Sequence, residues 1–227
     1  MKEKMITHCG GIQPEKSLAP NNITELVFIL DRSGSMAGLE TDTIGGFNSM
    51  IEKQKKLDGK VLVSTILFDN NSEVLHDRVD IQNVKPMTEE QYNVGGCTAL
   101  FDAIGGAIHH IGNIHKYARP EDVPAHTILV ITTDGFENAS RRYDNETIRC
   151  MIDRQQHVYG WEFLFVAANI DAVSTAGTIG ISPERAANYN YSKKGTRNLY
   201  DAVHCAVTSM RNCEDYNENW KEVLNKD

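Results

Sequence analysis

The sequence lacks the signals of secretion, of membrane insertion and of a structural zinc site. No apolar stretch approaches the roughly 20 residues of a membrane-spanning helix, and residues 1–20 contain no apolar core of a signal peptide. The five cysteines form no Cys-x-x-Cys pair, and an odd number at irregular spacing is typical of reduced thiols. We therefore expect a cytoplasmic protein without a membrane partner, although a chain trimmed of its signal peptide would look the same.

Basic charge is also scarce. The chain has 23 Lys and Arg residues against 31 Asp and Glu residues, for a net charge of −8. Non-specific nucleic-acid binding depends on Lys and Arg neutralising phosphates, so we expect no nucleic-acid partner, while a local basic patch stays compatible with the sequence. The motifs Gly-x-x-x-x-Gly-Lys-[Ser/Thr], Gly-x-Gly-x-x-Gly and Gly-x-Ser-x-Gly are missing, so nucleotide binding and serine hydrolysis have no sequence support.

What is present is a regular alternation of apolar strands and amphipathic helices over 227 residues, enough for one α/β domain. Such alternation predicts a doubly wound, Rossmann-like, mostly parallel sheet of about six strands, with helices on both faces. Residues 72–79 follow a turn and alternate in polarity, as in an antiparallel edge strand. We expect a lead-in segment over 1–22, the domain over 23–213 and a C-terminal tail over 214–227. The expected strands are 25–31, 61–68, 126–133, 161–168 and 187–191, and the expected helices are one from past Ser35 to Leu57, one that opens after Thr98, and 144–159, 171–179 and 195–211.

Oxygen-bearing side chains follow the first strand at alternate positions. Asp31, Ser33 and Ser35 come directly after the apolar run 26–30, in the order Asp-Arg-Ser-Gly-Ser. Thr98 lies in a later segment that begins Gly-Gly, and Asp134 follows the apolar run 128–131. Ligands of open α/β sheets sit outside the carboxyl ends of the strands, so we expect Asp31 and Asp134 to meet there. Hard oxygen donors packed closely suit a hard cation such as Mg²⁺.

This order, Asp-x-Ser-x-Ser, then Thr, then Asp, resembles the metal-ion-dependent adhesion site (MIDAS) of a von Willebrand factor A domain. The resemblance covers roughly residues 24–212 and points to the bacterial stand-alone intracellular type. It implies that Ser33 and Ser35 bind the ion directly and that Asp31 acts through water and hydrogen bonds. It further implies that Thr98 and Asp134 alternate between direct and water-mediated contact with the ion. Cys97 departs modestly from the family, and a soft thiolate does not suit a hard site.

The resemblance also implies a function in protein binding rather than catalysis. Mg²⁺, with Mn²⁺ or Ca²⁺ as alternatives, would keep an exchangeable position that a Glu or Asp carboxylate of a partner protein completes. Bacterial relatives of this type are often linked to AAA+ ATPases or stress-response proteins, and these are the partner classes that the resemblance suggests. The last helix could report a change of state at the site.

Two other functions are compatible with this sequence. A metal-dependent phosphate-ester hydrolase would use Asp31 as its nucleophile, but such enzymes usually carry a second Asp two positions on, where this chain has Ser33. A structural subunit with a vestigial site is the other rival.

Asp69 and Asp102 could add charge near the ion. The preferred interpretations are that Asp69 is a turn residue and that Asp102 is a carboxylate at the start of a helix. Glu137 and Asn138 could line the partner surface or be solvated. A surface or partly packed role is expected for the histidines His109, His110 and His115.

Overall fold

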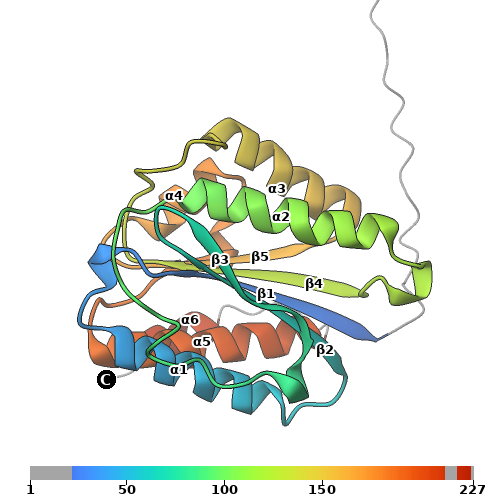
Figure 1. Ribbon diagram of the computed structural model, residues 1–227, viewed down its shortest axis with the longest axis horizontal. Helices are drawn as coiled ribbons and strands as arrows, with labels where there is room; N and C mark the ends of the chain where they lie inside the picture. Colours follow the sequence, from blue (N-terminus) through green and yellow to red (C-terminus); the bar gives the residue numbers. More distant parts are fainter. Residues whose placement is uncertain (1–21, 213–218, 226–227) are drawn as a thin grey trace, which may run out of the picture.

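A six-stranded sheet runs through the middle of the molecule (Figure 1). The computed structural model of the protein describes residues 22–212 and 219–225, so the expected lead-in segment over 1–22 lies, except for Asn22, outside the described residues. The strand order is β3-β2-β1-β4-β5-β6, and neighbouring strands are parallel except for the antiparallel pair β2 and β3. The strands are β1 (Ile23–Asp31), β2 (Lys60–Phe68), β3 (Ser72–Asp80), β4 (His126–Thr133), β5 (Glu162–Ala167) and β6 (Ala186–Asn188).

Helices cover both faces of this sheet, as Figure 1 shows. One face carries α1 (Glu40–Gln54), α5 (Lys193–Arg211) and α6 (Asn219–Leu224). The other carries α2 (Leu100–Tyr117), α3 (Asn145–Tyr159) and α4 (Ala172–Thr178). Side chains along a strand alternate between faces, so a central strand needs apolar residues at every position. In β1, Phe28 packs in the core beneath α1 and α5, while Val27 and Ile29 pack in the core beneath α2 and α3. The predicted α/β fold class is confirmed.

The segment after Ser35 differs from the expected helix. Residues 34–36 form a single 3-10 turn, and α1 begins only at Glu40 and ends at Gln54 rather than at Leu57. After this short turn, the backbone that follows β1 lies close to the loop that contains Gly95 and Gly96. The last strand is also shorter than expected, because β6 ends at Asn188 and the chain then turns toward α5.

The expected C-terminal tail over 214–227 contains part of the packed domain. Its described portion forms α6, and Trp220 and Leu224 of this helix are buried in the same core as α1 and α5. Burial of an indole ring removes a large apolar area from water, which holds this short helix in place. Of the helices built from residues 22–212 and 219–225, none is long and apolar enough to cross a lipid bilayer.

Candidate metal centre

Asp31 ends β1, and its carboxylate is held from two directions. Oδ1 accepts a hydrogen bond from the Ser33 backbone N–H at 2.7 Å, and Oδ2 accepts one from the Thr133 hydroxyl at 2.6 Å. The residue is 1% exposed. The neighbouring strands β1 and β4 pair in parallel up to Leu30 and Thr132, so their carboxyl ends meet at one edge. The strand order reverses between these two strands, which is where ligands of such sheets bind.

The two serines connect this loop to Asp134. Their hydroxyl oxygens lie 3.0 Å apart, and the Ser35 hydroxyl donates to Asp134 Oδ1 at 2.5 Å. Ser33 has an extended backbone just before the 3-10 turn, which brings both hydroxyls to the same side. Three of the five residues predicted from the sequence are therefore joined through one chain of contacts.

Backbone hydrogen bonds join the Thr98 loop (residues 94–99) to the serine loop (residues 32–36). The Gly34 N–H donates to the Gly96 carbonyl at 3.0 Å, and the Gly95 N–H donates to the Arg32 carbonyl at 2.9 Å. A Cβ atom on Gly34 would lie only 3.3 Å from the Gly96 oxygen, and Gly96 itself has a φ of +75°. Both positions therefore favour glycine, since any larger residue would separate the loops or strain the backbone.

Thr98 reaches the same point from the start of α2. Its N–H donates to the Asn138 side-chain oxygen at 2.9 Å, and the Asn138 N–H donates back to the Thr98 carbonyl at 3.0 Å. The hydroxyl oxygens of Ser35 and Thr98 lie 3.6 and 3.9 Å from the point where a Cβ atom on Gly135 would stand. The structure thus brings all five predicted residues together, with Thr98 facing the residue that follows Asp134.

Burial makes this cluster unfavourable for two negative charges. Burial raises the pKa of Asp134 to about 6; the Ser35 hydrogen bond opposes this shift and the nearby Asp31 charge adds to it. Burial also raises the pKa of Asp31, against the hydrogen bonds from Thr133 and Ser33. Asp134 Oδ2 is buried, and no described residue donates a hydrogen bond to it. A buried acceptor without a donor is costly, and a bound cation would satisfy it.

The donor set fits a hard divalent cation. It consists of two carboxylates and three hydroxyls, all oxygen, which suits Mg²⁺ or Mn²⁺ better than a soft metal. Over residues 22–212 and 219–225, no group of three or more His, Cys, Asp or Glu residues has an arrangement that could hold a metal ion. Any metal at this site would therefore depend on the hydroxyls as well as on the carboxylates.

Glu137 and Asn138 have a role that the sequence did not reveal. Glu137 accepts hydrogen bonds from the backbone N–H groups of Phe101, Ala139 and Ser140, and Asn138 pairs with both sides of the Thr98 peptide. These two residues fix the loop after β4 against the first turn of α2, rather than being merely solvated. Phe101 and Glu137 are 36 residues apart in sequence, so only the fold shows that this carboxylate lies at the N-terminus of α2.

Two tyrosines hold the main chain around the site, and neither was predicted from the sequence. The Tyr92 hydroxyl donates to the backbone carbonyl of Asp31, and the Tyr191 hydroxyl donates to the carbonyls of Ser35 and Ala37 at 2.6 and 3.2 Å. Tyr92 is buried, and Tyr191 is partly exposed at the rim. Each tyrosine joins a distant loop to the Asp31–Ser35 segment through a main-chain oxygen, and a main-chain partner leaves no trace in the sequence.

The remaining candidates have structural partners. Asp69 forms an ion pair with the Arg32 guanidinium at 2.9 Å, and Asp102 accepts hydrogen bonds from the backbone N–H groups of residues 141–143. Cys97 is exposed beside the site. The three histidines bind different groups: His109 contacts the Tyr143 hydroxyl, His110 contacts Asp77, and His115 contacts the buried Glu25. They are separate side chains, with His109 and His110 exposed and His115 partly packed, as expected.

Comparisons with known proteins extend the fold assignment. No family model and no curated protein matches the chain. Solved structures do match, including the D319A mutant of the PilB minor pilin from Streptococcus sanguinis, with a TM-score of 0.59, 10% identity and coverage of 85% of this chain and 62% of that one. A von Willebrand factor type A structure from Catenulispora acidiphila matches with a TM-score of 0.52 and 9% identity, over 81% of this chain and 42% of that one.

A third match carries a metal. Proximal thread matrix protein 1 from the mussel byssus, described with a zinc-occupied MIDAS motif, has a TM-score of 0.54 and 14% identity, and the match covers 82% of this chain and 46% of that one. The chain thus spans between about two fifths and three fifths of the length of these proteins. Its fold is the Rossmann-like α/β fold of von Willebrand factor A domains.

Proposed function

We propose that this chain binds proteins through a divalent cation held at the carboxyl ends of β1 and β4. The observation that carries the proposal is the buried, donorless Asp134 Oδ2 beside four other oxygen-bearing side chains. Similarity in fold to a protein with a metal-occupied MIDAS supports it. The residues proposed to hold the ion are Asp31, Ser33, Ser35, Thr98 and Asp134.

The roles follow from the contacts of each side chain. Ser33 and Ser35 would bind the ion directly, because their hydroxyls contact each other and the Ser35 hydroxyl contacts Asp134. Asp31 would act through hydrogen bonds, because both of its oxygens already accept donors from the protein. Neutral hydroxyl ligands leave the ion its Lewis acidity, which lets it accept a carboxylate from outside. Thr98 and Asp134 would exchange direct and water-mediated contact, as the resemblance suggests.

The finer proposals concern the metal and the partner. We propose Mg²⁺ as the physiological ion, with Mn²⁺ or Ca²⁺ as alternatives, because hydroxyl and carboxylate oxygens are ligands that hard cations prefer. The partner would be a protein that donates a Glu or Asp carboxylate, and an AAA+ ATPase or a stress-response protein in the cytoplasm is the class we favour. The protein would act as a binding module and not as an enzyme.

The phosphate-ester hydrolase alternative has weaker support. A nucleophilic Asp31 would need a free, accessible oxygen, whereas this carboxylate is 1% exposed and both of its oxygens accept short hydrogen bonds. The residue two positions on is Ser33, whose hydroxyl cannot serve as a comparable general acid. The geometry therefore favours binding over phosphoryl transfer.

Calorimetry tests the proposal directly. Mg²⁺ should bind the wild-type protein, and the double variant Ser33→Ala/Ser35→Ala should lose that binding because two proposed ligands are gone. A matched control is Ser182→Ala/Ser209→Ala, which removes two hydroxyls remote from the site and should bind Mg²⁺ as the wild type does. Undiminished binding in the first double variant would contradict the assignment.

A further inference from the structure

Two aromatic side chains flank the candidate metal centre on different loops. Phe136 stands two residues after Asp134 and is 65% exposed, which is unusual for a phenyl ring with no polar atom. Tyr191 lies next to the loop that carries Ser35 and is 36% exposed. A single exposed ring is ordinary on a protein surface, but two rings on loops beside one ligand site offer a partner apolar area to contact.

The backbone that presents Phe136 is firmly held. On one side of Phe136, the Gly135 N–H donates to the Thr133 hydroxyl oxygen at 3.4 Å. On the other side, Glu137 binds the first turn of α2 and Asn138 binds the Thr98 peptide. The ring therefore projects from a constrained loop tip. A pre-positioned aromatic contributes more to binding than a mobile one, because less conformational entropy is lost on association.

Tyr191 is fixed in a similar way. Its hydroxyl donates to the Ser35 and Ala37 carbonyls, so the position of the ring is set by the loop that carries the proposed serine ligands. The two rings thus belong to separate segments that both end at the metal centre. A partner that reaches the ion would pass beside these apolar groups.

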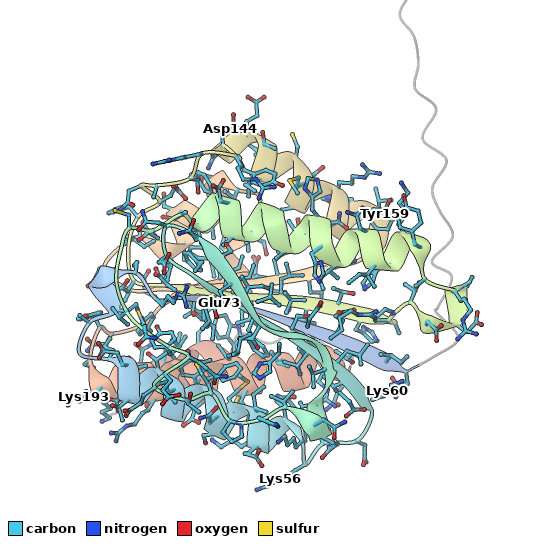
Figure 2. The ribbon with its side chains drawn as sticks, in the orientation of Figure 1. Lys56, Lys60, Glu73, Asp144, Tyr159 and Lys193 are labelled. Atoms are coloured by element: carbon cyan, nitrogen blue, oxygen red, sulfur yellow. The ribbon has the colours of Figure 1, made fainter. Side chains whose placement is uncertain are left out.

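The charges on the flanking loops favour an acidic partner. Arg141 and Arg142 are exposed in the loop that follows Asp134, and Lys193 and Lys194 are exposed just after Tyr191. Figure 2 shows Lys193 at the same end of the molecule as the turn after β1, far from Tyr159. Over residues 135–144 and 189–194, four basic side chains stand against two acidic ones, Glu137 and Asp144, in a chain whose net charge is −8. Complementary charge steers association and suppresses wrong partners.

We infer that the partner segment carries its metal-binding Asp or Glu next to a large apolar side chain, which packs on Phe136. In an extended segment, side chains at positions i and i+2 point to one face about 7 Å apart, so an acid and an apolar residue at this spacing could contact the ion and the ring together. The inference rests on the proposed function, because it assumes a bound cation at the five oxygen-bearing residues.

Selection from a phage-displayed random peptide library tests this inference. The wild-type protein is the bait in Mg²⁺, and elution is with EDTA. Enriched sequences should pair Asp or Glu with Phe, Leu, Ile, Trp or Met within two positions. Synthetic peptides of the best sequences should bind Phe136→Ser at least about tenfold more weakly than the wild type. The matched control is Tyr159→Ser, which removes a comparably exposed ring at the far end of the molecule. This variant should bind the peptides as tightly as the wild type does.

The outcomes separate the inference from the proposed function. Acidic sequences without apolar enrichment, equal binding to Phe136→Ser, or no EDTA-eluted sequences would overturn the role of Phe136. Calorimetry on the same variants measures Mg²⁺ binding independently of any peptide, and Phe136→Ser should retain it. If the wild-type protein gives no heat of Mg²⁺ binding, the proposed function is overturned, whatever the peptides show.

Discussion

At the scale of single residues, Asp134 shows how the site lowers the stability of the folded protein when no metal is bound. The carboxyl is 1% exposed, has one buried oxygen without a donor among the described residues, and has a second carboxylate nearby. Functional sites often keep such unfavourable groups because the ligand compensates for them. Asp31 does not share the unpaired oxygen, since Ser33 and Thr133 donate to it.

The first prediction concerns Asp134→Asn in metal-free protein. The folded-state pKa of Asp134 is about 6 and the ordinary value is 3.8, so folding favours the protonated carboxyl. The free energy of unfolding of the wild type should then fall as pH rises from about 4 to 6 and stay lower above that. The amide has no charge to bury and can still accept from Ser35, so the variant should be more stable at pH 7.5 by on the order of 1–3 kcal/mol.

Urea unfolding in EDTA at pH 7.5 and at pH 4 measures this difference. The advantage of the variant should shrink toward pH 4, where the wild-type carboxyl is also largely neutral. The same variant should fail to bind Mg²⁺ in calorimetry, because the amide supplies no negative charge. An advantage that does not change with pH would mean that charge burial at Asp134 is not its cause.

At the scale of elements, the sequence predicted the strands better than their connections. Continuous apolar runs such as 26–30 and 128–131 identify central strands, because both faces of the sheet are covered by helices. Asp31, Ser33, Ser35 and Asp134 could be named because they follow those strands. Thr98, which precedes a helix, could be named only through the resemblance to a known motif. The roles of Glu137, Asn138, Tyr92 and Tyr191 could not, because each depends on a main-chain partner distant in sequence.

The pair Gly45-Gly46 in α1 illustrates the same limit, because glycine simply weakens a helix in a sequence-based analysis. In the structure, a Cβ atom on Gly46 would lie 2.3 Å from a ring carbon of the buried Tyr200 in α5, whereas a Cβ atom on Gly45 would meet nothing within 4 Å. Gly46 is thus required by the close approach of α1 and α5, and Gly45 is not.

Alanine substitution should therefore have opposite effects at these adjacent positions. Gly46→Ala should destabilise the protein by about 1–3 kcal/mol, because the buried Tyr200 ring must move. Gly45→Ala should stabilise it by roughly 0.5–1 kcal/mol, because alanine favours the helix and the position is exposed. Chemical denaturation of the two variants beside the wild type provides the comparison, and each serves as the control for the other. Equal effects at both positions would contradict the proposed contact.

At the scale of the whole molecule, the candidate centre connects parts of the chain that are far apart in sequence. The serine loop follows β1, the Thr98 loop precedes α2, and Asp134 follows β4. Their mutual hydrogen bonds join the central strands to helices on one face, and Tyr191 adds the segment before α5 on the other. A ligand held by all of these loops can bind only the folded chain, so its binding should be coupled to global unfolding.

The last prediction follows from this coupling. At a free Mg²⁺ concentration about a hundred times the Kd, binding to the folded state alone should add about 2.7 kcal/mol of stability. For a domain of this size, that corresponds to a rise in Tm of roughly 5–10 °C. Differential scanning calorimetry in Mg²⁺ and then in EDTA measures the rise and its reversal. The variant Ser33→Ala/Ser35→Ala should show no rise, whereas Ser182→Ala/Ser209→Ala should match the wild type. A Mg²⁺-dependent shift of equal size in both double variants would place the stabilising ion somewhere other than between these loops.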